Sequence, residues 1–194
     1  MTLPFEQRDA DFSTAVRAET HAAQNSTNPT RPTPLPVRLE NIPESLTALN
    51  QWVLWRYVLK SGKWTKVPFQ TTGRPASTAN SQTWNCFDVI AKTYATGDYD
   101  GIGIALDGVA AEDGLTLAAV DIDKAVGNPE RERLAKTIIQ NINSYAELSP
   151  SGIGYRIFLR ASPLRSGINR NGVELYTSGR YLTVTGHTLD GDHA

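Results

Sequence analysis

The pattern of apolar and polar positions along this 194-residue chain predicts more strands than helices. Alternating or continuously apolar runs of four to eight residues, bounded by Gly, Ser, Pro or Asn, are typical of strands. Within 52–70, two such runs flank Ser61-Gly62, which predicts a β-hairpin. Further strands are expected in the segments 99–106, 115–123, 145–149, 155–161, 172–178 and 180–189.

Three segments have helical character. In residues 43–51, a short helix is expected to open after Pro43. Residues 83–97 begin with Thr83, which is expected to be the N-cap. Residues 128–143 have one Pro and two Glu in the predicted first turn. In the third, four apolar residues share one predicted face: Leu134, Ile138, Ile139 and Ile142. Together, strands and helices predict an α+β fold with a mostly antiparallel sheet.

Composition separates a tail from a domain. Residues 1–36 are rich in Thr, Asn, Pro and Ala, so they bury too little apolar surface to offset ordering and are expected to be disordered. A domain is expected over 37–190, followed by a frayed end at 191–194. No apolar run is long enough for a membrane span, and no signal peptide is evident. These features predict a cytoplasmic location without membrane association.

Two aspartates stand at the end of an apolar run. Asp121 and Asp123 are two residues apart, so in a strand their carboxylates project from the same face. Such a pair suits Mg²⁺ or Mn²⁺, which prefer oxygen ligands and often sit beside substrate phosphates. Solvated acids at a strand end are the simpler interpretation. A third acid from another strand would favour metal-assisted phosphoryl chemistry, and Glu174 is the candidate.

A turn rich in Ser and Gly is the second candidate site. Ser149, Ser151 and Gly152 lie between two predicted strands, where backbone amides and hydroxyls can approach a phosphate. Arg156, just inside the next strand, can add a charge-assisted hydrogen bond to a triphosphate. A tight hairpin turn with a surface arginine is the alternative. The chain has no GxxxxGK[ST] motif, which excludes a P-loop.

The order of these segments resembles a known family. "QWVLWRY…GKWTKVPF", "YDGIGIAL…AAVDID", "SYAELSPSGIGYRIFL" and "GVELYTSGRYLTVTGH" resemble successive segments of primase-polymerase (prim-pol) domains. These domains belong to the archaeo-eukaryotic primase superfamily, and the resemblance is greatest to those at the N-terminus of phage, plasmid and prophage replication proteins. It covers residues from about 40 to 190.

The resemblance implies a fold, an activity and roles for individual residues. The fold would be a small α/β unit packed on an RRM-like, mostly antiparallel palm sheet. Asp121, Asp123 and Glu174 match the acids that bind the catalytic Mg²⁺ or Mn²⁺. Arg156 stands where many relatives have a histidine. The segments that would contact the nucleotide contribute Ser149, Ser151, Gly152, Arg156, Lys66, Arg180 and His187.

The implied activity is DNA-templated nucleotidyl transfer, as a DNA primase or DNA polymerase, in replication of a mobile element. Its partners would be single-stranded DNA template, a primer and nucleoside triphosphates. A helicase, as a further domain or a separate subunit, is expected beyond residue 194, and this chain would then be a piece of a longer protein. Two alternatives stay open: a non-catalytic DNA-binding module of a replication initiator, and a glycosyltransferase with a DxD metal site.

Overall fold

The structure, a computed structural model, describes residues 29–189, of which 31–189 belong to one compact unit. Most of the predicted tail (1–28) and residues 190–194 lie outside the described residues. Residues 31–36, which the composition assigned to the tail, contact the domain: Leu35 N donates to Pro150 O at 2.8 Å. No helix within 29–189 is long and apolar enough to cross a membrane.

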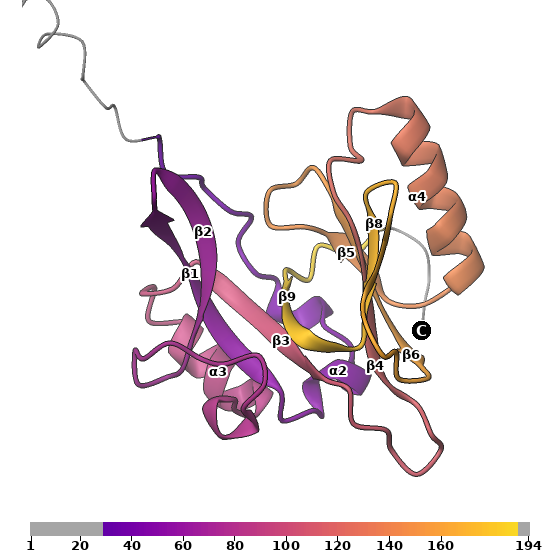
Figure 1. Cartoon of the computed structure of the whole chain (residues 1–194). Helices are drawn as coiled ribbons and strands as arrows, with labels where there is room; N and C mark the ends of the chain where they lie inside the picture. Colours follow the sequence, from indigo (N-terminus) through magenta and orange to yellow (C-terminus); the bar gives the residue numbers. More distant parts are fainter. Residues whose placement is uncertain (1–28, 190–194) are drawn as a thin grey trace, which may run out of the picture. The chain divides into compact units, whose positions relative to one another are not determined.

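Nine strands form two sheets (Figure 1). The four-stranded sheet has the order β2-β1-β3-β9, and the five-stranded sheet has the order β5-β6-β4-β8-β7. All strand pairs are antiparallel. The strands are β1 (Trp52–Lys60), β2 (Lys63–Phe69), β3 (Gly101–Asp107), β4 (Thr116–Ile122), β5 (Ala146–Leu148), β6 (Tyr155–Ala161), β7 (Ile168–Arg170), β8 (Val173–Tyr176) and β9 (Ser178–Val184).

The helices within the described residues are few and short. They are η2 (Leu39–Asn41), α2 (Glu44–Thr47), η3 (Ser81–Thr83), α3 (Phe87–Tyr94) and α4 (Pro129–Ile142). The predicted α+β class with a mostly antiparallel sheet is confirmed. The three predicted helical segments and the 52–70 hairpin are present, whereas the short strand β7 was not predicted.

The boundaries of α4 follow from its sequence. Asn128 caps the N-terminus by accepting a hydrogen bond from Arg131 N, Pro129 occupies the first turn, and Asn143 ends the helix with φ +48°. The buried face is centred on Ala135, which is fully buried, with Ile138, Ile139 and Ile142 partly buried beside it. Leu134, predicted on that face, is exposed, because the face is rotated by one residue.

The start of α3 differs from the prediction. Cys86, not Thr83, is the N-cap residue. The Thr83 hydroxyl is used earlier, because it donates to Asn80 O at 2.7 Å and accepts a hydrogen bond from Ser77 N at 3.0 Å. Thr83 therefore stabilises the loop around η3, and the helix starts three residues later than Thr83 would place it.

Two main cores hold the sheets. The larger one combines one face of the four-stranded sheet, including Trp52, Ile104 and Leu182, with Ala119 and Phe158 of the five-stranded sheet. The second lies between the opposite face of the five-stranded sheet and α4. The five-stranded sheet is thus covered on both faces.

Candidate catalytic site

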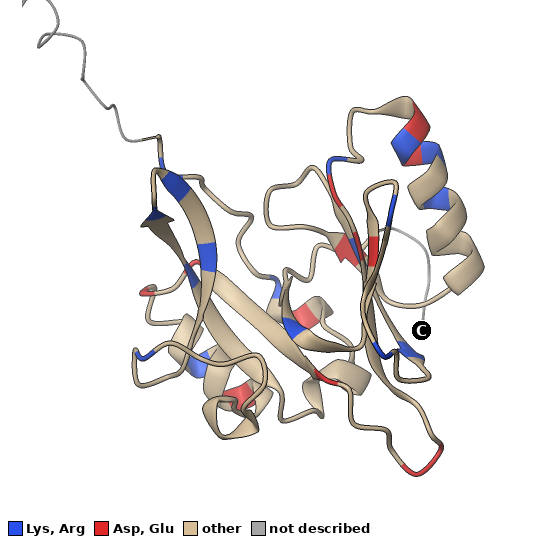
Figure 2. Ribbon diagram, viewed as in Figure 1, with Lys and Arg blue, Asp and Glu red and all other residues tan. Residues whose placement is uncertain are grey.

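A row of polar residues crosses the whole five-stranded sheet. In strand order the cross-strand partners are Glu147, Arg156, Asp121, Glu174 and Asn169. Directly paired residues of antiparallel strands project from the same face, so these side chains form one continuous line, called here the polar row. Figure 2 shows acidic and basic segments on neighbouring strands of this sheet. The predicted acids Asp121 and Glu174 are therefore direct neighbours.

The free edge of β9 lies against the polar row. β9 pairs with β3 along one edge only. On the other edge, Arg156 Nη1 donates to Thr183 O at 2.8 Å and also contacts Thr183 Oγ1, while Glu147 accepts hydrogen bonds from Thr185 N and Gly186 N. Buried backbone groups need such partners. The polar row thus supplies side-chain partners for an edge strand that lacks a second neighbour.

Arg156 and Glu147 form the buried half of the row. Arg156 is 5% exposed and Glu147 is fully buried. Tyr145 Oη donates to Glu147 Oε2 at 2.7 Å, and Arg156 Nε lies 3.3 Å from Asp121 Oδ1. Burial raises the pKa of Glu147, and the hydrogen bonds from Tyr145, Gly186 and Thr185 oppose this shift. The Arg156 guanidinium, predicted as a triphosphate ligand, therefore already has protein partners.

Asp121, together with Asp123 just beyond the row, forms what is called here the open half. The Asp121 side chain is 16% exposed, and Asp123, just beyond the end of β4, is exposed. Burial raises the pKa of Asp121, the charge of Arg156 opposes the rise, and the charge of Asp123 adds to it. The two carboxylates therefore repel each other across a short distance. A divalent cation would relieve that repulsion.

Lys66 reaches the same place from the four-stranded sheet. The pKa of Lys66 is lowered to about 8, mainly by burial and also by the charge of Arg156, while the charges of Asp121 and Asp123 oppose both effects. The Lys66 Nζ atom is 5.9 Å from the centroid of the Trp55 ring. An amine from one sheet and two carboxylates from the other thus share one electrostatic environment. These three residues, Asp121, Asp123 and Lys66, are called here the acid–lysine site.

Glu174 is next to Asp121 in register but is held by neighbours. Its Oε1 accepts a hydrogen bond from Asn169 Nδ2 at 2.6 Å and its Oε2 accepts one from Tyr176 Oη at 2.9 Å. Within residues 29–189, no three His, Cys, Asp or Glu side chains come together as a compact metal-binding group. Proteins often hold Mg²⁺ through only one or two carboxylates, with water and substrate phosphates as the other ligands. The donor set of Asp121 and Asp123 fits this cation.

The Ser-Gly turn packs against the end of β4. A Cβ atom on Gly154 would lie 2.8 Å from Ile122 O and 3.5 Å from the Asp123 Cα atom, so only glycine permits this approach. Ser149 is buried; its O and Oγ atoms accept hydrogen bonds from Gly152 N and Gly154 N. The turn is therefore beside Asp123, and two of its amides are engaged within the turn. Ser151 is exposed, and its Oγ lies 3.1 Å from Ser149 Oγ.

Arg180 and His187, both predicted to contact the nucleotide, lie in different parts of the domain. The Arg180 guanidinium is 4.9 Å from the centroid of the Tyr176 ring, whose hydroxyl binds Glu174, so Arg180 is near the third acid. His187 Nε2 lies 2.8 Å from Pro36 O, and its ring therefore contacts the segment that precedes the predicted domain. The described contacts do not bring His187 to Asp121 or Asp123.

Residues that the sequence analysis missed complete this region. Tyr57 is the cross-strand partner of Lys66, and Tyr181 Oη donates to Lys66 O at 2.9 Å. Burial raises the pKa of both tyrosines, and the charge of Arg156 opposes the shift. In the sequence, the only indication of these two tyrosines was that they alternate with apolar residues in β1 and β9. Glu147 was also missed, because its role as acceptor for Thr185 N is visible only in the folded structure.

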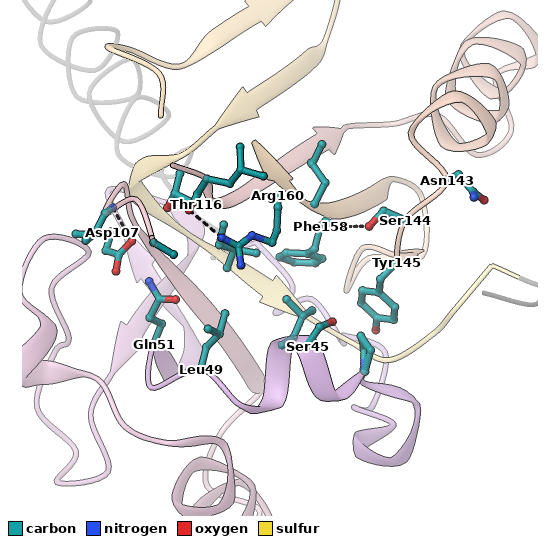
Figure 3. A pocket seen from close by; sticks show the side chains of 17 residues that line it. Ser45, Leu49, Gln51, Asp107, Thr116, Asn143, Ser144, Tyr145, Phe158 and Arg160 are labelled. Atoms are coloured by element: carbon teal, nitrogen blue, oxygen red, sulfur yellow. Dashed lines mark hydrogen bonds between the residues drawn. The ribbon is translucent and has the colours of Figure 1, made fainter. Parts of the chain in front are cut away.

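A separate cavity of about 660 Å³ contains none of the predicted site residues (Figure 3). Its walls include Leu46 and Leu49 near α2 together with Leu117, Tyr145 and Phe158. Arg160, at its rim, forms an exposed ion pair with Asp113 at 2.7 Å. The cavity belongs to the side of the larger core, and the acid–lysine site does not open into it.

Comparison with known proteins bears on the family of the chain. No family model matches the chain. A curated protein, the DNA Primase-polymerase of Nitratiruptor phage NrS-1, is 28% identical over 158 residues. The alignment covers 76% of this chain and 21% of that protein. This similarity supports a prim-pol domain in the chain.

The similarity concerns one part of the phage protein, because the chain spans about a fifth of its length. At the level of the family, the comparison supports a nucleotidyltransferase and a role in replication.

Proposed function

We propose that this chain is a DNA-templated nucleotidyltransferase, a DNA primase or DNA polymerase that acts in the replication of a mobile element. The observation that carries the proposal is the acid–lysine site. Two repelling carboxylates from the five-stranded sheet meet an amine from the four-stranded sheet. A cation and a polyphosphate together would complement these charges.

The reaction forms one bond and breaks another. The oxygen of a 3′-hydroxyl attacks the α-phosphorus of a nucleoside triphosphate, the hydroxyl proton is lost, and the bond to the bridging oxygen breaks to release pyrophosphate. Asp121 and Asp123 would hold Mg²⁺ or Mn²⁺, with Glu174 as the third acid. When bound, such a cation lowers the pKa of the attacking hydroxyl and offsets the charge that develops on phosphate.

The protein's own residues position the triphosphate. Protonated Lys66 is suited to donate to phosphate oxygens. Ser151 contributes an exposed hydroxyl in the turn that packs beside Asp123 through Gly154, while Ser149 and Gly152 shape the turn. Arg156 stabilises the ionised form of Asp121 and thereby keeps it available as a ligand. Arg180, next to the Glu174–Tyr176 pair, is placed for a phosphate that extends toward β8.

Single-stranded DNA template, primer and nucleoside triphosphates are the proposed partners. A helicase beyond residue 194, as a further domain or a separate subunit, and action in the cytoplasm remain predictions from the family resemblance. His187 has no proposed contact with the triphosphate in this arrangement, because its ring nitrogen contacts Pro36 O.

Extension of a labelled primer on a single-stranded template tests the proposal. The parent chain, with four dNTPs and Mg²⁺ or Mn²⁺, should extend the primer, whereas Asp121→Asn and Asp123→Asn should each lower the rate by at least about a hundredfold. Asp113→Asn, which removes an exposed carboxylate of the β3–β4 loop, is the matched control and should extend normally.

A second readout separates metal binding from turnover. Electron paramagnetic resonance of Mn²⁺ should show bound ion with the parent and with Asp113→Asn, and weaker binding with Asp121→Asn and Asp123→Asn. If parent and variants bind template equally but none extends a primer with either cation, the catalytic proposal fails. The chain would then be the non-catalytic DNA-binding module.

A further inference from the structure

The β1–β2 hairpin presents aromatic and basic residues next to the acid–lysine site. In its register Tyr57 pairs with Lys66, and Leu59 pairs with Trp64. Cross-strand partners two residues apart share a face, so these four side chains lie on the same side of the hairpin. At the tip, Lys60 pairs with Lys63, and by the same alternation these two exposed lysines project from the opposite side. The face therefore carries Tyr57, Trp64 and Lys66 without the lysines of the tip.

Arg31 lies over this face although it is far away in sequence. Its guanidinium carbon is 5.9 Å from the centroid of the Tyr57 ring and 5.8 Å from that of Trp64. Asp100 Oδ2 accepts hydrogen bonds from Arg31 Nη2 at 2.5 Å and from Tyr57 N at 2.6 Å. The Arg31 side chain is still 47% exposed. The cation is therefore anchored in place but remains open to a ligand.

The segment that follows Arg31 fixes its position. Pro32, Pro34 and Pro36 restrict the backbone to extended conformations. Farther along, Leu35 N donates to Pro150 O at 2.8 Å, and Arg38 N donates to Thr185 O at 2.8 Å. The segment thus connects the hairpin with the Ser-Gly turn and with the strand end after β9 (Figure 1). Arg31 is consequently a part of the folded domain.

We propose that Arg31, Tyr57 and Trp64 bind single-stranded nucleic acid and guide the template to the acid–lysine site. These three residues are called here the hairpin track. Proteins that bind single strands combine basic residues, which follow the phosphates, with aromatic rings, on which bases stack. The planar guanidinium of Arg31 can serve both purposes. The inference rests on the proposed function and assigns the surface for its template.

The choice of ligand follows from the mixture of groups. A purely acidic partner would need the cation of Arg31 but would leave the rings of Tyr57 and Trp64 without a role. A base has a π-face that can stack on either ring, and each base is joined to a phosphate that Arg31 can contact. Asp100 does not repel the strand, because its carboxylate is 10% exposed and is paired with Arg31.

Fluorescence anisotropy with a labelled single-stranded oligonucleotide tests the track. The assay uses the whole chain without metal or nucleotide, at several salt concentrations. Arg31→Gln should weaken binding about tenfold and reduce the slope of log affinity against log salt by about 0.7. Trp64→Ala should weaken binding about tenfold with the slope unchanged, because it removes stacking and no charge. Arg31→Lys should retain the slope and lose only part of the affinity.

Lys136→Gln is the matched control. Lys136 is exposed on α4, on the far side of the five-stranded sheet from the polar row, and its removal changes the net charge by the same amount as Arg31→Gln. The inference is overturned if Arg31→Gln and Trp64→Ala bind with the affinity and slope of Lys136→Gln. It is equally overturned if the parent binds no single strand at low salt. Circular dichroism of each variant establishes that it is folded.

Primer extension distinguishes this inference from the proposed function. At subsaturating template, Arg31→Gln should extend the primer about tenfold more slowly than the parent, because the track contributes to template binding, whereas Lys136→Gln should extend at the parent rate. If the parent extends primers while the track variants bind normally, the track is wrong and the proposed function stands. If the parent binds through the track but does not extend primers, the track stands and the catalytic proposal is wrong.

Discussion

The buried half and the open half both consist of charged residues, but their surroundings differ. Glu147 and Arg156 are buried, and their polar atoms bind β9 and the residue that follows it. Asp121 and Asp123 are more exposed, and their charges act on Lys66 of the four-stranded sheet. Charged residues at or next to strand positions thus serve two purposes. Burial and existing partners distinguish the group that holds the fold from the group that is free to bind.

The difference also explains why an acidic pair can persist at the open half. Arg156 is held by Thr183, so its charge stays 3.3 Å from Asp121 whether or not a ligand is bound. That fixed charge opposes the rise in the pKa of Asp121 that burial causes. Arg156 of the buried half therefore favours the ionised form of Asp121 in the open half. The predictions below test this division, from the largest expected effect to the smallest.

Glu147→Ala should cause the largest loss of stability. It leaves the amides of Thr185 and Gly186 without their acceptor and removes an anion near Arg156, which should lower the free energy of unfolding by about 2–5 kcal/mol. Asp123→Asn, at the exposed end, should change it by less than about 0.5 kcal/mol. Urea denaturation measures both values. Equal losses in the two variants would contradict the division into halves.

Lys66→Gln should weaken nucleoside triphosphate binding by about ten- to a hundredfold, the usual value of a hydrogen bond to a charged group. Lys66→Arg should bind nearly as well as the parent. Because the pKa of Lys66 is lowered to about 8, the protonated amine predominates only below that pH. In metal-free buffer, parent affinity should therefore fall as the pH rises above about 8.

Lys66→Arg provides the control for that pH dependence. Arginine stays protonated throughout this range, so its affinity should not change between pH 7 and 9. The charged groups that act on Lys66 are Arg156, Asp121 and Asp123. Calorimetric titration of a non-hydrolysable triphosphate measures the affinities. A parallel decline in parent and Lys66→Arg would mean that another group titrates.

Much of the fold could be predicted from local patterns. The hairpin at 52–70 followed from alternation and Ser61-Gly62, and α4 followed from its capping residues. The strand β7 was missed because three residues are too few to show an alternation of apolar and polar positions. Leu134 was assigned to the wrong face because its apolar neighbours fit two adjacent helical faces, and only packing against the sheet selects one.

The candidate site was predictable in its residue types but not in their partners. Glu174 was proposed as the third acid beside Asp121 from the sequence and again from the family resemblance, and the strand register makes the two residues direct neighbours. That Arg156 binds the edge of β9 could not be inferred, because the contact with Thr183 spans the two sheets. Arg31 was assigned to a tail by composition. Its contacts with Asp100 and Tyr57 depend on tertiary structure alone.

Gly103→Ala should disturb the surface that faces the open half. A Cβ atom there would lie 2.7 Å from Leu182 O and 2.9 Å from the Tyr181 ring, so the ring must move. Overpacking of this kind costs about 1–3 kcal/mol. Thermal unfolding should show the loss, and triphosphate binding should weaken as well, because Tyr181 Oη donates to Lys66 O. An unchanged melting temperature would show that β3 and β9 can separate without cost.

Tyr176→Phe should have the smallest effect on Mn²⁺ affinity. It tests whether Glu174 binds the cation or only supports the fold. The substitution removes one hydrogen bond to Glu174 Oε2, worth about 1 kcal/mol, and keeps the ring beneath Arg180. If Glu174 belongs to the open half, Tyr176→Phe should alter Mn²⁺ affinity by less than about tenfold, whereas Glu174→Gln should lower it much further. If Glu174→Gln leaves Mn²⁺ affinity unchanged, the carboxylate belongs with Asn169 and Tyr176 as a structural group, and the cation is held by Asp121 and Asp123 alone.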